Sequence, residues 1–152
     1  MSAERLAVRD ATANDLPALR SLYLRARQDA FTWLETGNYT LHDFDADTAG
    51  EQIRVAASDA GTVLGFSSLW RQDLFIHHLY VLPGHERRGV GRALIDDLRN
   101  RYGSADLALK CQSRNTRALA FYHALGFEPV ESATGPDGPY HLLRLPHTRP
   151  AR

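Results

Sequence analysis

Residues 85–92, HERRGVGR, place three arginines around two glycines, directly after the apolar stretch LFIHHLYVLP. Glycine lets a backbone come close to a ligand, and the first turn of a helix presents N–H groups that have no internal partner. The helix dipole adds partial positive charge at the same end. A strand, a glycine turn and a helix in this order favour an anion site for phosphate. The competing interpretation is a solvated helix start with flexible arginines.

The standard nucleotide motifs do not fit this stretch. A dinucleotide fingerprint needs glycine or alanine three residues after Gly91, where Leu94 stands. Gly84 and Gly89 have P-loop spacing, but Val90 and Gly91 replace the lysine and the hydroxyl residue that bind phosphate and magnesium. The sequence also lacks the HExxH and paired CxxC patterns of zinc sites. We therefore expect no metal and a different phosphate-bearing ligand.

Two separate segments carry a resemblance to a known family. LYVLPGHERRGVGRALIDDL at 79–98 and NTRALAFYHALGF at 115–127 resemble the acetyl-coenzyme A binding core of the GCN5-related N-acetyltransferases. The resemblance is strong over 75–127, and the expected element order on either side agrees with that family's fold. It implies an acetyl-CoA-dependent N-acetyltransferase in which acetyl-CoA is the cosubstrate.

The resemblance also implies which residues hold coenzyme A. In the family pattern Gln/Arg-x-x-Gly-x-Gly/Ala, backbone amides hold the pyrophosphate. Glu86 departs from this pattern at the Gln/Arg position, so we expect its carboxylate to turn outward or to pair with an arginine. The implied cofactor-binding residues are Leu79, Tyr80, Val81, Arg87, Arg88, Gly89, Val90, Gly91, Arg92, Asn115 and Tyr122.

Direct acetyl transfer to an amine needs a base and an acid. An ammonium has no lone pair, so a base or a water relay must remove its proton. His77 occupies the position where several family members place a catalytic glutamate or histidine, and histidine titrates near neutral pH. Tyr122 matches the tyrosine that protonates the leaving sulfur. His77 and His78 are neighbours on an expected strand, so we expect them to point to opposite faces, which argues against a shared metal. Cys111 is expected to be a small buried residue, not a nucleophile.

In the family the acceptor enters between the first two helices and the last strands. The implied substrate-binding residues are Phe31, Trp33, His78 and Tyr140; Tyr39, Phe44, Asp43, Asp45 and Asp47 lie in the same region of the sequence. Aromatic rings and carboxylates together suit a cationic amine, although the aspartates also fit helix caps in a solvated loop. The sequence leaves amino acids, polyamines, aminoglycosides and protein N-termini open as acceptors.

The predicted element order is β-α-(α)-β-β-β-α-β-α-β-β, an α/β (α+β) arrangement around one mixed sheet of about seven strands. With the resemblance, it implies a single N-acetyltransferase domain over 1–152, helices on both faces and splayed central strands. The strands are expected at 5–12, two within 52–70, 74–83, 105–111, 129–132 and 140–145. Helices are expected from Leu16 to Ala30, from Val90 to Tyr102, and after Asn115 up to Gly126, and the irregular segment 31–51 is expected to hold a loop and a short second helix.

Composition narrows the classes of function. The 152 residues contain 18 Lys and Arg against 18 Asp and Glu, which argues against a general nucleic-acid coat. One cysteine fits a reducing compartment, and no signal peptide or membrane span is evident, so we expect a cytoplasmic protein without membrane or nucleic-acid partners. A non-catalytic coenzyme A sensor or partner subunit is the main alternative; an arginine-based nucleic-acid module is the other. A homodimer is compatible with the family.

Overall fold

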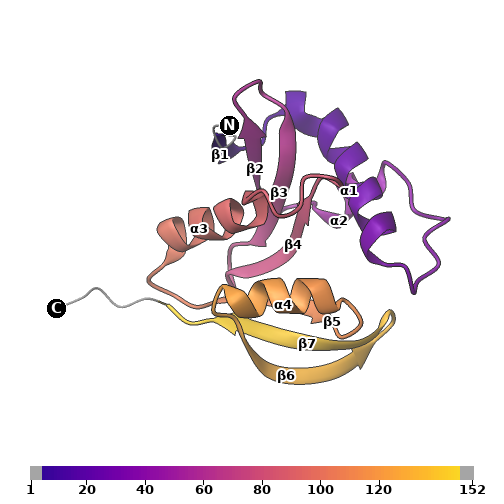
Figure 1. Ribbon diagram of the computed structural model, residues 1–152, viewed down its shortest axis with the longest axis vertical. Helices are drawn as coiled ribbons and strands as arrows, with labels where there is room; N and C mark the ends of the chain where they lie inside the picture. Colours follow the sequence, from indigo (N-terminus) through magenta and orange to yellow (C-terminus); the bar gives the residue numbers. More distant parts are fainter. Residues whose placement is uncertain (1–4, 148–152) are drawn as a thin grey trace.

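The computed structural model describes residues 5–147, and these residues form one seven-stranded sheet with helices on both faces (Figure 1). The strand order is β1-β2-β3-β4-β5-β7-β6, with β4 and β5 parallel and every other neighbouring pair antiparallel. The mixed sheet and the order of elements confirm the fold expected from the sequence. The strands are β1 Leu6–Asp10, β2 Gln52–Ser58, β3 Val63–Trp70, β4 Phe75–Val81, β5 Leu107–Gln112, β6 Glu128–Gly135 and β7 Gly138–Leu145.

The three longer helices begin and end close to the predicted residues, and the short second helix lies within the segment 31–51 that was expected to hold it. They are α1 Leu16–Ala30, α2 Asp43–Asp47, α3 Val90–Tyr102 and α4 Thr116–Ala124, with a 3₁₀ turn at Ala13–Asp15 before α1. Asn115 caps α4, its side chain accepting the Ala118 N–H at 3.2 Å. The last two strands are longer than expected, because the glycine-rich segment between them is a tight hairpin in which Gly135 pairs with Gly138.

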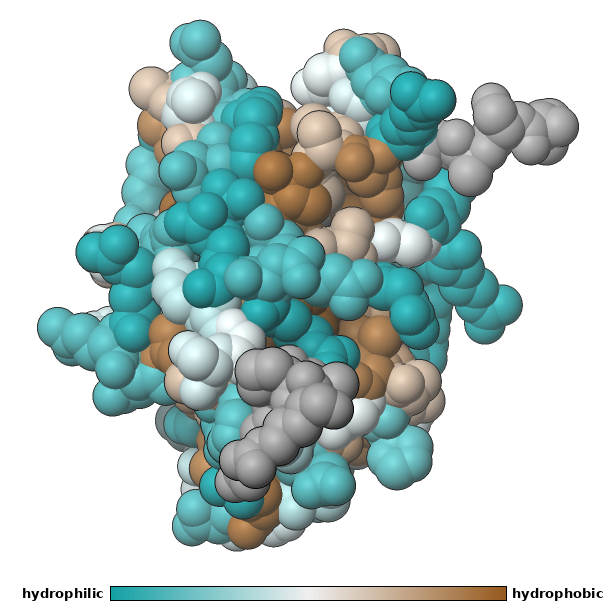
Figure 2. All heavy atoms as spheres, turned by 90° about the vertical axis from the view of Figure 1, so that its left-hand side faces the viewer, coloured by the Kyte–Doolittle hydropathy of each residue, from teal (hydrophilic) through white to brown (hydrophobic). Residues whose placement is uncertain are grey.

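The apolar core is divided by the sheet. On one face α1 and α2 bury Leu19, Tyr23 and Phe44 against Val55 and Phe66. On the other face, α3 contributes Val90 and Leu94 to one cluster and Ile95 and Leu98 to another, which α4 also joins. The side of the molecule that carries α3 is mostly hydrophilic outside, with exposed apolar atoms in separate groups (Figure 2). No helix within residues 5–147 is long and apolar enough to cross a membrane.

The two central strands separate soon after they meet. β4 and β5 pair only at Phe75 with Ala108 and at Ile76 with Leu109, although both strands continue beyond these residues. By contrast, β5 pairs with β7 along its whole length, from Leu107 to Gln112. The predicted splay is therefore confirmed, and it opens directly after Ile76, where the two histidines begin.

Candidate active site

The glycine turn after β4 leads into α3 and exposes backbone donors. Gly89 stands at the helix N-cap with φ +82°, in the left-handed region that glycine tolerates. The first intrahelical hydrogen bond runs from Ala93 N–H to Gly89 C=O at 2.9 Å, so the amides of residues 90–92 have no partner within the helix. Arg87, without being glycine, has φ +66°, a strained geometry that clusters at ligand sites. These features fit a bound pyrophosphate.

Gly91 has a packing role beside its backbone donor. A Cβ built on it would lie 2.8 Å from Cζ of Phe121, so glycine lets the first turn of α3 approach α4 closely. Glu86, the residue that departs from the family pattern, accepts a hydrogen bond from Gly84 N–H at 2.8 Å. Its carboxylate is thus engaged with the turn's own backbone, and within residues 5–147 it makes no ion pair with an arginine.

One cavity of about 1460 Å³ joins the glycine turn, the splay and the segment after α1. Two polar atoms on its lining residues, Nδ1 of His85 and Oε1 of Gln112, are buried without a hydrogen-bond partner among the described residues. Such orphaned groups are expected to meet a ligand or water. Arg88 does not line the cavity. The predicted residues that do are Phe31, Trp33, His77, His78, Leu79, Tyr80, Val81, Arg87, Gly89, Val90, Gly91, Arg92, Asn115, Tyr122 and Tyr140.

The two histidines do not point to opposite faces, so that expectation is wrong. The register of β3 with β4 shifts, Ser68 pairing with His78 and Leu69 with Ile76, which leaves His77 as an extra residue in a bulge. The bulge breaks the alternation of side chains. The rings of His77 and His78 consequently lie against each other, with centroids 3.9 Å apart and planes inclined by 32°.

Glu51 joins the histidine pair. One donor atom from each of Glu51, His77 and His78 lies within 4.8 Å of the others, so the argument against a shared metal from opposite faces no longer applies. However, Nδ1 of His77 lies 2.7 Å from Oε2 of Glu51. This is a hydrogen-bond distance, and it is shorter than the roughly 3.3 Å between two donors at ~2.0–2.1 Å on a tetrahedral zinc. The geometry therefore favours a carboxylate–imidazole pair over a metal centre.

His78 is held in a less polar environment than its neighbour. Its ring lies edge-on to Tyr23, with 5.2 Å between centroids, and its Nε2 is 3.3 Å from the backbone oxygen of Asp47. Burial, helped by the adjacent His77, lowers the pKa of His78 to about 4. His78 is consequently neutral at physiological pH and presents a flat wall to His77.

Tyr122 is buried, with 8% of its surface exposed, yet it lines the cavity. Within residues 5–147 its phenol oxygen has no hydrogen-bond partner, and burial raises the pKa of the phenol above its usual value. It is therefore protonated at neutral pH and able to donate. Burial also raises the pKa of the nearby Cys111 thiol to about 11. A thiol in this state is a poor nucleophile, which supports the expectation that Cys111 takes no part in the chemistry.

The far end of the cavity combines rings and charges. The guanidinium of Arg27 stacks between Tyr23 and Tyr39, 3.8 and 4.2 Å from the ring centroids, and pairs with Asp43 at 3.2 Å. Phe31 and Trp33 meet edge to face at 5.6 Å.

The aspartates expected in this region have separate roles. Asp47 lines the cavity and accepts a hydrogen bond from Tyr23 Oη at 2.7 Å. Asp45 pairs with Arg20 at 2.7 Å outside the cavity, and Phe44 lies in the core, 1% exposed.

Sequence reasoning missed Glu51, His85, Gln112 and Arg27. His77 and Glu51 are 26 residues apart in the sequence, and their contact depends on the β4 bulge. No glycine or proline in the sequence marks this bulge. Gln112 is the last residue of β5, a strand that the sequence did predict. It lines the cavity because β4 and β5 separate there.

A family model of the acetyltransferase (GNAT) family matches residues 16–127. A peptidyl-lysine N-acetyltransferase, YiaC of Escherichia coli, is 32% identical over 130 residues, covering 83% of this chain and 86% of the relative. The ribosomal protein bS18-alanine N-acetyltransferase of the same species is 29% identical over 119 residues, 74% of each chain. A crystal structure of the PaiA N-acetyltransferase from Thermoplasma acidophilum with coenzyme A has a TM-score of 0.76 at 15% identity, covering 93% of this chain and 99% of that one.

The protein belongs to the GNAT family of acetyltransferases. The seven-stranded sheet, the glycine turn at the start of α3 and the splay between β4 and β5 are thus those of an N-acetyltransferase, an acyltransferase enzyme.

Proposed function

We propose that the protein transfers the acetyl group of acetyl-CoA directly to a primary amine on a small molecule or peptide, with His77 as the base and Tyr122 as the acid. The observation that carries this proposal is the placing of His77 in the cavity at the start of the splay, between the glycine turn and the aromatic end. The bound cosubstrate supplies the activated acetyl group as a thioester.

The protein's own groups then handle two protons. His77 takes a proton from the cationic amine, which leaves the nitrogen with the lone pair that bonds to the acetyl carbon. Tyr122 gives its phenolic proton to the sulfur as the carbon–sulfur bond breaks, and the nitrogen releases its second surplus proton to solvent as the amide forms. His77 is 44% exposed as a side chain, so it can pass its proton to solvent. Tyr122 regains a proton from solvent before the next turnover.

The acceptor end supports a cationic amine, and the first acceptor class to test is a lysine side chain in a peptide. Asp47 offers a carboxylate at the cavity wall, and the ring of Tyr80 also lines the cavity; aromatic faces attract cations. The 32% identical relative acts on peptidyl lysine, which supports the same choice. A peptide N-terminus is the second acceptor class, because the bS18 relative acts on an alanine of a ribosomal protein.

The test combines binding and transfer. Purified protein is heated with acetyl-CoA, CoA, ATP or NAD, and acetyl transfer to lysine peptides, blocked and free at the N-terminus, is followed by mass spectrometry. We expect thermal stabilisation by acetyl-CoA and CoA alone and acetylation at the lysine ε-amine. Stabilisation by acetyl-CoA without transfer to a broad amine panel would instead support a non-catalytic sensor or partner subunit.

A further inference from the structure

Glu51 is a buried carboxylate that the proposed chemistry has not yet used. It lies between α2 and β2, and its side chain is 2% exposed. One oxygen accepts a hydrogen bond from Ser68 Oγ on β3, and the other lies 2.7 Å from Nδ1 of His77 on β4. Burying a carboxylate is costly unless it is hydrogen-bonded, so its two partners hold it in one place. Three segments of the chain therefore converge on the proposed base.

We propose that Glu51 is a positioning residue for His77, which it acts through without touching the substrate. The proposal rests on the proposed function. A carboxylate only accepts hydrogen bonds, so the pair at 2.7 Å requires a proton on Nδ1 of His77. In the neutral imidazole the lone pair then lies on Nε2. Glu51 thus selects the tautomer that can take a proton from the acceptor amine at Nε2.

The same pair helps after the proton has moved. When Nε2 takes the amine's proton, the imidazole becomes a cation next to the Glu51 carboxylate, and a charge-assisted hydrogen bond is stronger than a neutral one. The electron pair of the amine forms the new bond to the acetyl carbon, so charge and atoms balance. The acceptor amine, His77 and Glu51 would thus act as nucleophile, base and orienting group, an arrangement that many enzymes use to activate a nucleophile.

The remaining neighbours of His77 fix the ring without competing for the carboxylate. His78 stacks on it at 3.9 Å and contributes no charge at neutral pH, since its pKa is lowered to about 4. Its own Nε2 is directed to the Asp47 backbone oxygen at 3.3 Å. Among the described residues, the titratable groups in contact with the His77 ring are Glu51 and His78. Of these, the hydrogen bond to Nδ1 of His77 comes from Glu51.

The test is a double-mutant cycle in which kcat is measured with acetyl-CoA and the lysine peptide of the proposed function as the acceptor. Glu51→Gln keeps the shape and removes the charge, and we expect kcat to fall roughly 10–100-fold, which is no more than the lower end of the ~10²–10⁴ that a positioned base itself contributes. The KM for acetyl-CoA should change less than about 2-fold. Because Glu51 works through His77, adding Glu51→Gln to His77→Gln should lower kcat no further. Glu131→Gln, an exposed glutamate of β6, is the matched control.

Two further measurements test the proposal even if the Glu51→Gln variant folds poorly. Ser68→Ala leaves the carboxylate in place but removes its second partner, and we expect a kcat loss of about 3–10-fold that also disappears in the His77→Gln background. Long-range ¹H–¹⁵N spectra of the wild-type protein should show His77 with its proton on Nδ1.

The outcomes separate the two proposals. An unchanged kcat in Glu51→Gln, losses that multiply in the double mutant, or a proton on Nε2 of His77 would overturn the positioning role while leaving acetyl transfer intact. An unchanged kcat in His77→Gln would overturn the base in the proposed function, and with it the use of Glu51.

Discussion

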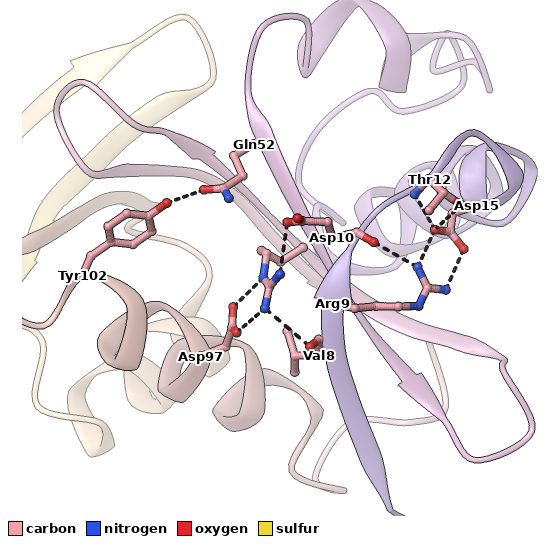
Figure 3. A network of polar contacts seen from close by, with 9 residues as sticks. Val8, Arg9, Asp10, Thr12, Asp15, Gln52, Asp97 and Tyr102 are labelled. Carbon is pink, nitrogen blue, oxygen red and sulfur yellow. Dashed lines mark hydrogen bonds and ion pairs between the residues drawn. The ribbon is translucent and has the colours of Figure 1, made fainter.

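Two polar clusters meet β2, and they use similar groups for different ends. Arg54 in β2 donates to Asp97 of α3 at 3.0 and 2.7 Å, to Asp10 of β1 at 3.0 Å and to the Val8 carbonyl at 3.4 Å. Figure 3 shows Asp97, Asp10 and Val8 gathered around the guanidinium. Just before β2, Glu51 has Ser68 and His77 as its only hydrogen-bonded side-chain partners within residues 5–147.

The difference lies in what remains free. The carboxylates raise the pKa of the Arg54 guanidinium, which stays charged and occupied at any physiological pH, so this cluster can only join β1, β2 and α3. In the Glu51 cluster, His77 uses one ring nitrogen and is 44% exposed toward the cavity. A group that can gain and lose a proton, with one side fixed and the other accessible, can do chemistry.

The largest expected effect is on catalysis. His77→Gln should lower kcat about 10²–10⁴-fold at neutral pH while the protein's melting temperature and its stabilisation by acetyl-CoA stay unchanged. The loss should shrink above the lysine pKa of ~10.4, where the acceptor amine is already deprotonated. Acetylation rates between pH 7 and pH 10.5, with the exposed His123→Gln as control, test this. An equal loss at every pH would contradict the role of base.

Arg54→Ala should lower the stability of the protein and leave catalysis unchanged, which is the opposite of what we expect for His77→Gln. It leaves the Asp97 side chain, which is only 12% exposed, without its ion-pair partner, so the free energy of unfolding should fall by about 3 kcal/mol. The kcat per folded molecule should be unchanged, because Arg54 does not line the cavity. Urea unfolding beside Arg71→Ala, an exposed arginine, measures the loss. A kcat loss comparable with that of His77→Gln would remove the distinction between the clusters.

Tyr122→Phe tests the proposed acid, which also lines the cavity. Removing the phenolic oxygen should lower kcat about 10–100-fold by leaving the sulfur without its proton donor. Affinity for CoA, measured by calorimetry, should change less than about 3-fold. Phenylalanine keeps the packing against Phe127, whose ring centroid lies 5.3 Å away. A collapse of stability with no separate rate effect would show that Tyr122 serves the core alone.

The smallest effect concerns the second arginine pair in Figure 3. Arg9 donates to both oxygens of Asp15 at 2.8 and 3.0 Å, and this lowers the pKa of the Asp15 carboxyl from 3.8 to about 2. A lowered carboxyl pKa stabilises the fold above pH 3.8, and the contribution is lost as pH falls toward 2.

Asp15→Asn should therefore cost about 1–2 kcal/mol at pH 6, reduced by the exposure of Arg9, and markedly less near pH 2.5. Urea unfolding of the wild type and the variant at both pH values gives the difference. A cost that did not change with pH would mean that the charge of Asp15 contributes nothing.

The sequence predicted most of the fold, and many of the residues it singled out line the cavity. The order of strands and helices followed from periods and stop signals, as in the change of period at Val90 and the cap at Asn115. The glycine turn at the start of α3 was predicted because the spacing of residues along a short segment determines where a helix begins, although Arg88 lies outside the cavity. The predicted orientation of His77 and His78 was wrong. Side chains alternate along a strand only while its hydrogen bonding to the neighbouring strand is regular, and here a bulge interrupts the pairing of β3 with β4.

The sequence by itself determined the local features of this protein: the strands, the helix caps and the glycine turn that exposes backbone amides after β4. These depend on residues within a few positions of one another. Only the tertiary structure decided which buried carboxylate meets the histidine of the cavity. Glu51, Ser68 and His77 come from three separate segments. Their contact depends on strand register, on the bulge at His77 and on the splay of β4 from β5, which follow from packing across the whole sheet.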